Sequence, residues 1–79
     1  MKKYNSSNVG ERFSLYLRIL RISQKRISQL SGVPESTVSR FCLGRPIASD
    51  NLQKLLLVSD DLSLEWLFMG RGYPIIVND

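Results

Sequence analysis

Apolar residues recur every three or four positions along most of the chain, which is the spacing of one face of an α-helix. The first series predicts a helix from about Ser7 or Asn8 to about Arg21, with an apolar stripe of Val9, Phe13, Tyr16, Leu17 and Leu20. Three cations lie on the same segment and are expected to be solvated, although any of them would also strengthen binding to a nearby polyanion: Arg12, Arg18 and Arg21.

Residues 23–42 have the pattern of two short helices joined by a tight turn. Ser23 is a suitable N-cap for the first of them, because its hydroxyl can accept a hydrogen bond from a free backbone N–H. Ile27 and Leu30 then share one side of that helix. Gly32 follows at the point where a chain leaving a helix most often needs a left-handed residue.

The second helix of this pair is predicted to begin at Pro34, whose fixed φ suits a first helical turn. One face of the helix is apolar and consists of Val38, Phe41 and Cys42. The opposite face carries side chains that can form hydrogen bonds, namely Glu35, Ser36, Ser39 and Arg40. A short helix with a polar outer face, supported by a second helix and a glycine turn, is a helix-turn-helix unit.

Two more helices are predicted after residues 43–46, whose glycine and proline end the preceding helix. The fourth helix is expected to be capped by Ser49 or Asp50. Its inward side is expected to carry Leu52, Leu55 and Leu56. The fifth helix is short and lies between an N-cap at Ser63 and a closing glycine at Gly70. The expected fold is therefore an all-α, compact five-helix domain around the central helix-turn-helix.

The chain of 79 residues is long enough for one domain with a single core. We divide it into a flexible basic tail over 1–7, the helix-turn-helix domain over 8–72 and an apolar C-terminal tail over 73–79. The last segment is rich in residues that favour β-structure, so a short C-terminal strand is allowed in an otherwise helical fold.

The net charge of +4 is distributed unevenly. Residues 1–45 contain nine Lys or Arg and two acids, a net charge of +7, whereas residues 46–79 contain two bases and five acids, a net charge of −3. The basic half is also the half with the helix-turn-helix. This asymmetry is typical of a protein that binds nucleic acid, although a solvated surface can also be uneven by chance.

The residue composition argues against most other chemistry. The chain has no histidine and one cysteine, so we expect no disulfide, no zinc or other metal site, no cofactor and no catalysis. Cys42 lies on an apolar helix face and is expected to be a small buried hydrophobic residue. The chain lacks a signal-peptide pattern and an apolar run of membrane-spanning length, which favours a cytoplasmic location and no membrane partner.

The helix-turn-helix resembles that of the phage lambda-type repressor and Cro family, and the residues that carry the resemblance are Gln24, Ile27, Ser28, Gly32, Val33, Ser36, Val38 and Arg40. The segment LSLEWLFMG resembles the last helix of the repressor domains, so the similarity covers roughly residues 8–72. Three positions depart from the family pattern: Ser28 replaces a small alanine, Ser31 an apolar residue, and Pro34 the usual Ser or Thr cap.

The predicted base-contacting residues are the four on the outer face of the recognition helix, Glu35, Ser36, Ser39 and Arg40. Arg40 can pair with guanine through two hydrogen bonds, and Glu35 can accept one from cytosine N4. Glu35 could instead serve only to complement the helix dipole. Thr37 points to the side of the helix and is better placed for a phosphate.

The predicted phosphate-binding residues are Gln24, Lys25, Thr37 and Arg45. The resemblance implies that the Gln24 amide binds a DNA phosphate and that Arg45 matches the basic residue of a phosphate-binding loop. Lys25 and Arg26 lie in a first helical turn, where cations are unfavourable unless an anion binds there, and plain solvation is the alternative for both.

The sequence therefore predicts a sequence-specific regulator of transcription that binds double-stranded DNA in the bacterial cytoplasm, most simply a phage-type repressor on an operator. It would be a short Cro-like regulator or a fragment of a longer repressor, with no small-molecule ligand. An antitoxin that binds a toxin and contacts DNA secondarily is the alternative from another class. DNA recognition of this kind usually needs a homodimer.

Two surfaces are candidates for dimerisation. One is the fifth helix around Trp66, which could instead be a core residue, and the other is the apolar tail with Tyr73, Ile75, Ile76 and Val77. The tail could also fold back as an edge of its own domain.

Overall fold

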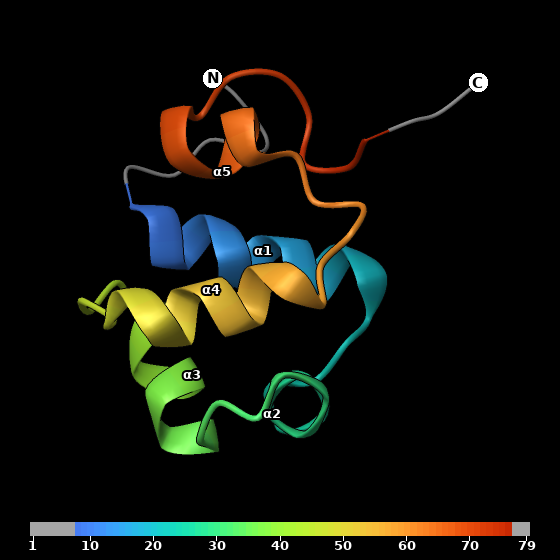
Figure 1. Ribbon diagram of the computed structural model, residues 1–79. Coiled ribbons are helices and arrows are strands. Elements are labelled where there is room, and N and C mark those ends of the chain that lie inside the picture. The colour runs from blue at the N-terminus through green and yellow to red at the C-terminus, as the bar shows by residue number, and fades with distance from the viewer. Residues whose placement is uncertain (1–7, 77–79) are drawn as a thin grey trace.

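The computed structural model describes residues 8–76, and in this range the secondary structure is helical apart from one isolated β-bridge. The helices are α1 (Val9–Leu20), α2 (Gln24–Ser31), α3 (Glu35–Cys42), α4 (Ser49–Leu57) and α5 (Leu64–Met69). Figure 1 shows α2 and α3 at one end of the molecule, α5 at the opposite end and α1 between them. The predicted all-α, five-helix fold is confirmed. Within the described part of the chain, the helices are too short to cross a membrane.

Side chains cap three of the helices. Asn8 Oδ1 accepts hydrogen bonds from the N–H groups of Gly10 (2.7 Å) and Glu11 (3.2 Å) at the start of α1. The predicted caps of α2 and α5 are confirmed, because Ser23 Oγ accepts from the Arg26 N–H and Ser63 Oγ from the Trp66 N–H.

The predicted cap of α4 is wrong. The N-cap residue is Ala48, which has no side chain that could accept a hydrogen bond, and Ser49 and Asp50 are already helical. The backbone carbonyl of Ala48 accepts from the Leu52 N–H at 3.0 Å, so the helix begins one residue earlier than the polar side chains indicate.

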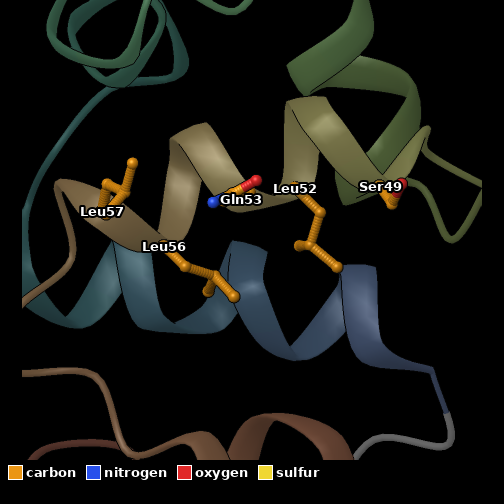
Figure 2. A pocket seen from close by; sticks show the side chains of 5 residues that line it. All are labelled: Ser49, Leu52, Gln53, Leu56 and Leu57. Carbon is orange, nitrogen blue, oxygen red and sulfur yellow. The ribbon is translucent and has the colours of Figure 1, made fainter.

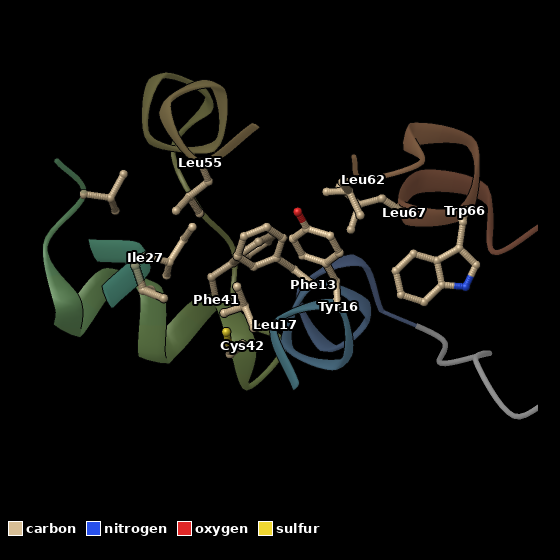
Figure 3. Close-up of a cluster of buried hydrophobic side chains, with 12 residues drawn as sticks. Phe13, Tyr16, Leu17, Ile27, Phe41, Cys42, Leu55, Leu62, Trp66 and Leu67 are labelled. Atoms are coloured by element: carbon tan, nitrogen blue, oxygen red, sulfur yellow. The ribbon is translucent and has the colours of Figure 1, made fainter. Parts of the chain in front are cut away.

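The core contains residues from all five helices and is shown in Figure 3. Phe13 lies near its centre, with ring centroids 5.8 Å from Tyr16 and 5.7 Å from Phe41. The buried apolar residues are Phe13, Tyr16, Leu17, Ile27, Val33, Val38, Phe41, Cys42, Leu55, Leu62, Trp66 and Leu67. The predicted inward faces of α1 and α3 are therefore confirmed at their central positions.

Leu30 does not share the burial of Ile27, although the two residues lie on neighbouring positions of one side of α2. Ile27 is buried, but the Leu30 side chain is 47% exposed. Three residues turn an α-helix by about 300°, so Leu30 lies about 60° away from Ile27 around the axis of α2. Since α2 has only eight residues and packs along the Ile27 side, this rotation is enough to bring Leu30 to the surface.

Arg12 is buried rather than solvated, which corrects another expectation. Arg12 is 6% exposed. Its Nε atom donates a hydrogen bond to the Leu67 carbonyl at 2.6 Å, and its Nη2 atom donates one to the Phe68 carbonyl at 3.3 Å. These carbonyls belong to the last turn of α5, where the backbone lacks helical partners and the helix dipole favours a cation. Arg12 therefore attaches α1 to α5.

Trp66 is 1% exposed, so the structure shows it as a core residue. Its placement on a dimerisation surface is corrected, because a ring buried inside its own domain cannot contact a second subunit. The exposed apolar side chains of α5 are instead Leu64, Phe68 and Met69.

The C-terminal tail folds back onto its own domain. Leu62 and Ile75 form an antiparallel bridge, in which the Ser63 N–H donates to the Pro74 carbonyl (2.8 Å) and the Ile76 N–H to the Asp61 carbonyl (2.7 Å). This is one of the two arrangements that the sequence allowed, although one bridge replaces the expected strand. Val77 and the tail at 1–7 lie outside the described residues.

Candidate nucleic-acid interface

The turn between α2 and α3 is built on Gly32, which has φ 80° and donates its N–H to the Ser28 carbonyl at 2.9 Å. Two serines complete the turn. Ser28 Oγ donates to the Val33 carbonyl at 2.6 Å, and Ser31 Oγ accepts from the Val33 N–H at 3.1 Å. Side-chain hydrogen bonds of both serines therefore help to fix the backbone of the turn.

Helix α3 has one buried and one outward face, as the sequence predicts. Val38, Phe41 and Cys42 are buried, whereas Glu35, Ser36 and Arg40 are exposed and Ser39 is half-buried. Pro34 precedes the helix, and no side chain caps its N-terminus. The four predicted base-contacting residues are therefore at least partly accessible along α3, with Ser39 the least accessible.

The C-terminal end of α3 is fixed by a Schellman motif. Gly44 has φ 95°, its N–H donates to the Phe41 carbonyl at 2.9 Å, and the Arg45 N–H donates to the Arg40 carbonyl at 3.0 Å. The Nδ2 of Asn8 donates to the Gly44 carbonyl at 3.1 Å. One asparagine thus caps the start of α1 and holds the end of α3.

The backbone of α1 lies directly against the backbone of α3 at Gly10. A Cβ atom at this position would overlap the carbonyl group of Phe41, so only glycine fits. The sequence analysis did not identify Asn8 and Gly10 as positioning residues for α3. An early glycine inside a predicted helix was the available signal, because such a glycine often marks a close backbone contact.

The four predicted phosphate-binding residues lie on or beside α2 and α3. Gln24 and Lys25 are in the first turn of α2, where Gln24 is half-buried and Lys25 exposed. Thr37 is half-buried on α3, and Arg45 is exposed just after it. The fold brings these elements to one end of the molecule (Figure 1).

The charge of this end is strongly positive. Between Arg12 and Ser49 the chain contains one acid, Glu35. The exposed cations of this segment are Arg18, Arg21, Lys25, Arg26, Arg40 and Arg45. At the opposite end, α5 and the segment before it carry Asp60, Asp61 and Glu65. Only the α2–α3 end therefore has the charge that suits a polyanion.

Two titratable groups away from this surface have shifted pKa values. Burial raises the pKa of the Cys42 thiol, which keeps it neutral. Burial, together with a 2.5 Å hydrogen bond from the Tyr16 hydroxyl to Asp61 Oδ1, raises the pKa of Tyr16. Residues 8–76 contain no cluster of three or more potential metal ligands.

A shallow hollow on α4 is lined by Ser49, Leu52, Gln53, Leu56 and Leu57. Figure 2 shows Leu52 and Leu56 directed to the side of α4 that faces α1. The residues that line the hollow are apolar or uncharged.

Comparison with protein-family models, with curated proteins and with solved structures finds no match for the chain.

Proposed function

We propose that this chain is a sequence-specific, double-stranded-DNA-binding regulator of transcription, and that α3 enters the major groove. The observation that carries the proposal is the solvent-accessible surface of α3, where Glu35, Ser36 and Arg40 are exposed while Val38 and Phe41 are buried in the core. A helix of this width fits the major groove, and side chains with these hydrogen-bonding groups can distinguish base pairs there.

Contacts to bases and contacts to phosphates have separate roles in the proposal. Arg40 pairs with a guanine through O6 and N7, and Glu35 accepts from a cytosine amino group. Ser36 and Ser39 lie between these two charged residues in the sequence, and their hydroxyl groups form further hydrogen bonds with the bases. The phosphates are bound by Gln24, Lys25, Thr37 and Arg45, which fix the position of the helix without selecting a sequence.

The proposed regulator acts as a homodimer, because one α3 contacts too few base pairs to select a single genomic site. Two copies would place their α3 helices about 34 Å apart on successive major grooves. Exposed apolar residues that a second copy could cover are Leu64, Phe68 and Met69 of α5, which lies at the end of the molecule away from α3, and Tyr73 and Ile76 after that helix. Such a protein would act in the bacterial cytoplasm, as a phage-type repressor does.

The same apolar residues support the second candidate, an antitoxin that binds a toxin, since an exposed apolar patch suits any protein partner. Sedimentation of the purified chain separates the two. A concentration-dependent dimer supports self-association, whereas a monomer at all concentrations leaves the patch to a different protein.

The test of the proposed function is selection of bound sequences from a pool of random duplex DNA. We expect enrichment of a two-fold symmetric motif with half-site centres about 10 base pairs, or a multiple of this, apart. A folded chain that enriches no motif and binds all duplexes equally would contradict sequence-specific recognition.

A further inference from the structure

Arg21 has an unusual backbone conformation. It ends α1 with φ 58° and ψ 39°, and within residues 8–76 it is the only residue other than glycine with a positive φ. The same left-handed conformation ends α2, α3 and α5, and there it is adopted by Gly32, Gly44 and Gly70. A residue with a Cβ atom is less stable in this region than glycine, so glycine would serve the end of α1 better.

The geometry of the turn does not require arginine. The Arg21 N–H donates to the Arg18 carbonyl (3.1 Å) and the Ile22 N–H to the Leu17 carbonyl (2.9 Å), and both bonds use backbone atoms alone. The Arg21 side chain is exposed and makes no hydrogen bond or ion pair with the described residues. The dipole of α1 favours a cation here, but at the surface this gain is smaller than the cost of the left-handed backbone.

The surroundings of Arg21 are unfavourable for a further cation. Arg18, Lys25 and Arg26 are also exposed, and residues 12–34 contain no acid. Lys25 and Arg26 lie in the first turn of α2, where the helix dipole is positive. The connection between α1 and α2 therefore has two free-energy costs, which are the repulsion among these cations and the backbone strain at Arg21.

Both costs are offset when a polyanion lies against this connection. One residue, Ile22, separates Arg21 from Ser23, the N-cap of α2, so the Cα atoms of Arg21 and Ser23 are at most about 7.6 Å apart. Figure 1 shows the connection leading from α1 to the end of the molecule that contains α2 and α3. A DNA strand that meets the start of α2 is then within reach of the Arg21 guanidinium.

We propose that Arg21 binds a backbone phosphate of DNA, next to the phosphate at the start of α2, and that this contact is why the end of α1 has arginine instead of glycine. The inference rests on the proposed function and extends its contact surface from α2 and α3 to the end of α1. Arg18, one turn earlier on α1, adds a second cation for the same strand.

The test is to compare the stability and the DNA affinity of Arg21→Gly, using a short duplex of random sequence as the probe. We expect the melting temperature to rise by about 4 °C, because the strain is removed. We expect affinity at about 50 mM salt to fall roughly five- to tenfold, and the slope of log K against log salt to become shallower by about 0.9. A gain in stability combined with a loss in affinity is the signature of the proposed contact.

Two variants complete the test. Arg21→Lys keeps the charge and the strain, so it should retain the salt slope and the melting temperature of the original chain. Arg71→Gln removes one positive charge at the α5 end, where Arg71 forms an exposed ion pair with Glu65, and should change neither slope nor affinity.

Arg21→Gly with unchanged affinity and slope would overturn the inference while the original chain still binds DNA. An equal loss in Arg71→Gln would also overturn it, because net charge alone would then explain the effect. An original chain that binds no duplex at low salt would reject the proposed function itself.

Discussion

The two ends of the molecule are attached to α1 in different ways. At the α3 end the contact is mainly apolar and close, with Phe13 packed on Phe41 and Gly10 directly against the α3 backbone, and Asn8 adds one hydrogen bond to Gly44. At the α5 end polar side chains supplement the apolar packing, as Arg12 donates to the Leu67 carbonyl and Tyr16 to Asp61.

The outward surfaces of the two ends differ in polarity in the opposite direction, because here the α5 end is the more apolar one. The outer side chains at the α2–α3 end include four cations beside the exposed Leu30 and Leu43, whereas those of α5 include the exposed Leu64, Phe68 and Met69. One end therefore suits a polyanion and the other a protein surface. The comparison shows how a single small core can support two surfaces of different chemistry, and the predictions below test it from the largest expected effect to the smallest.

The strongest test of the close contact at the α3 end is Gly10→Ala. The added methyl group overlaps the Phe41 carbonyl, which is backbone and cannot move without displacing α3. We expect a loss of roughly 3 kcal/mol in the free energy of unfolding, measured by urea denaturation with circular dichroism. The matched control is Gly72→Ala, where no atom lies within 4 Å and only the strain at φ 82° remains, about 1 kcal/mol. Equal effects of the two variants would contradict the close contact.

At the α5 end the corresponding test is Arg12→Met, which keeps an apolar stem of similar length. The carbonyls of Leu67 and Phe68 lose their charged donor, and we expect a loss of roughly 2 kcal/mol. Trp66 is the only tryptophan in the chain, so its fluorescence during urea denaturation reports on this end directly. Arg18→Met, at an exposed position of the same helix, should stay within about 0.5 kcal/mol. Similar losses of stability in both variants would mean that the hydrogen bonds from Arg12 to the α5 carbonyls do not stabilise the fold.

Arg40→Ala tests whether the polar surface of α3 selects a sequence. At the selected DNA site we expect a loss of about 1–3 kcal/mol in binding free energy and a relaxed preference at one base pair, with little change on random duplex. Quantitative binding titrations on both DNAs measure this difference. A uniform loss on the two DNAs would show that Arg40 contacts phosphate instead.

The smallest effect is expected at Tyr16, through its dependence on pH. Burial and the bond to Asp61 raise the pKa of Tyr16 above its ordinary value of about 10. The neutral hydroxyl therefore stabilises the fold fully below about pH 10, and this contribution is lost as the pH rises further. Relative to Tyr16→Phe, the original chain should lose at most about 1.4 kcal/mol of stability per pH unit above pH 10. Urea midpoints of both proteins at about pH 8 and about pH 11 provide the comparison, and parallel pH profiles would contradict it.

The elements of the fold could be predicted from the sequence because each depends on a few neighbouring residues. The caps at Ser23 and Ser63 and the left-handed glycines at Gly32 and Gly70 form bonds within four residues along the chain. The inward face of α3 follows from helical spacing alone. The outer face of the same helix, which carries the proposed base contacts, could be predicted for the same reason.

The contacts that position α3 could not be predicted in this way, because their partners are distant in sequence. Asn8 binds Gly44 across 36 residues, and the need for glycine at position 10 comes from the backbone of Phe41. Arg12 is different, since it lies three residues after Val9 and its spacing already places it on the buried face of α1. Its charge argued for solvent, and only the carbonyl groups at the end of α5 make a buried position favourable.

The separation of charge between the two ends makes the molecule an electric dipole. In the field of a polyanion such a molecule experiences a torque, which turns its basic end, with α2 and α3, toward the anion before contact. The outward face of α3 would then arrive already oriented, which shortens the rotational search and raises the association rate. Added salt screens this torque over a distance of about 8–10 Å, so the speed of encounter, and not only its strength, is set by the ionic strength.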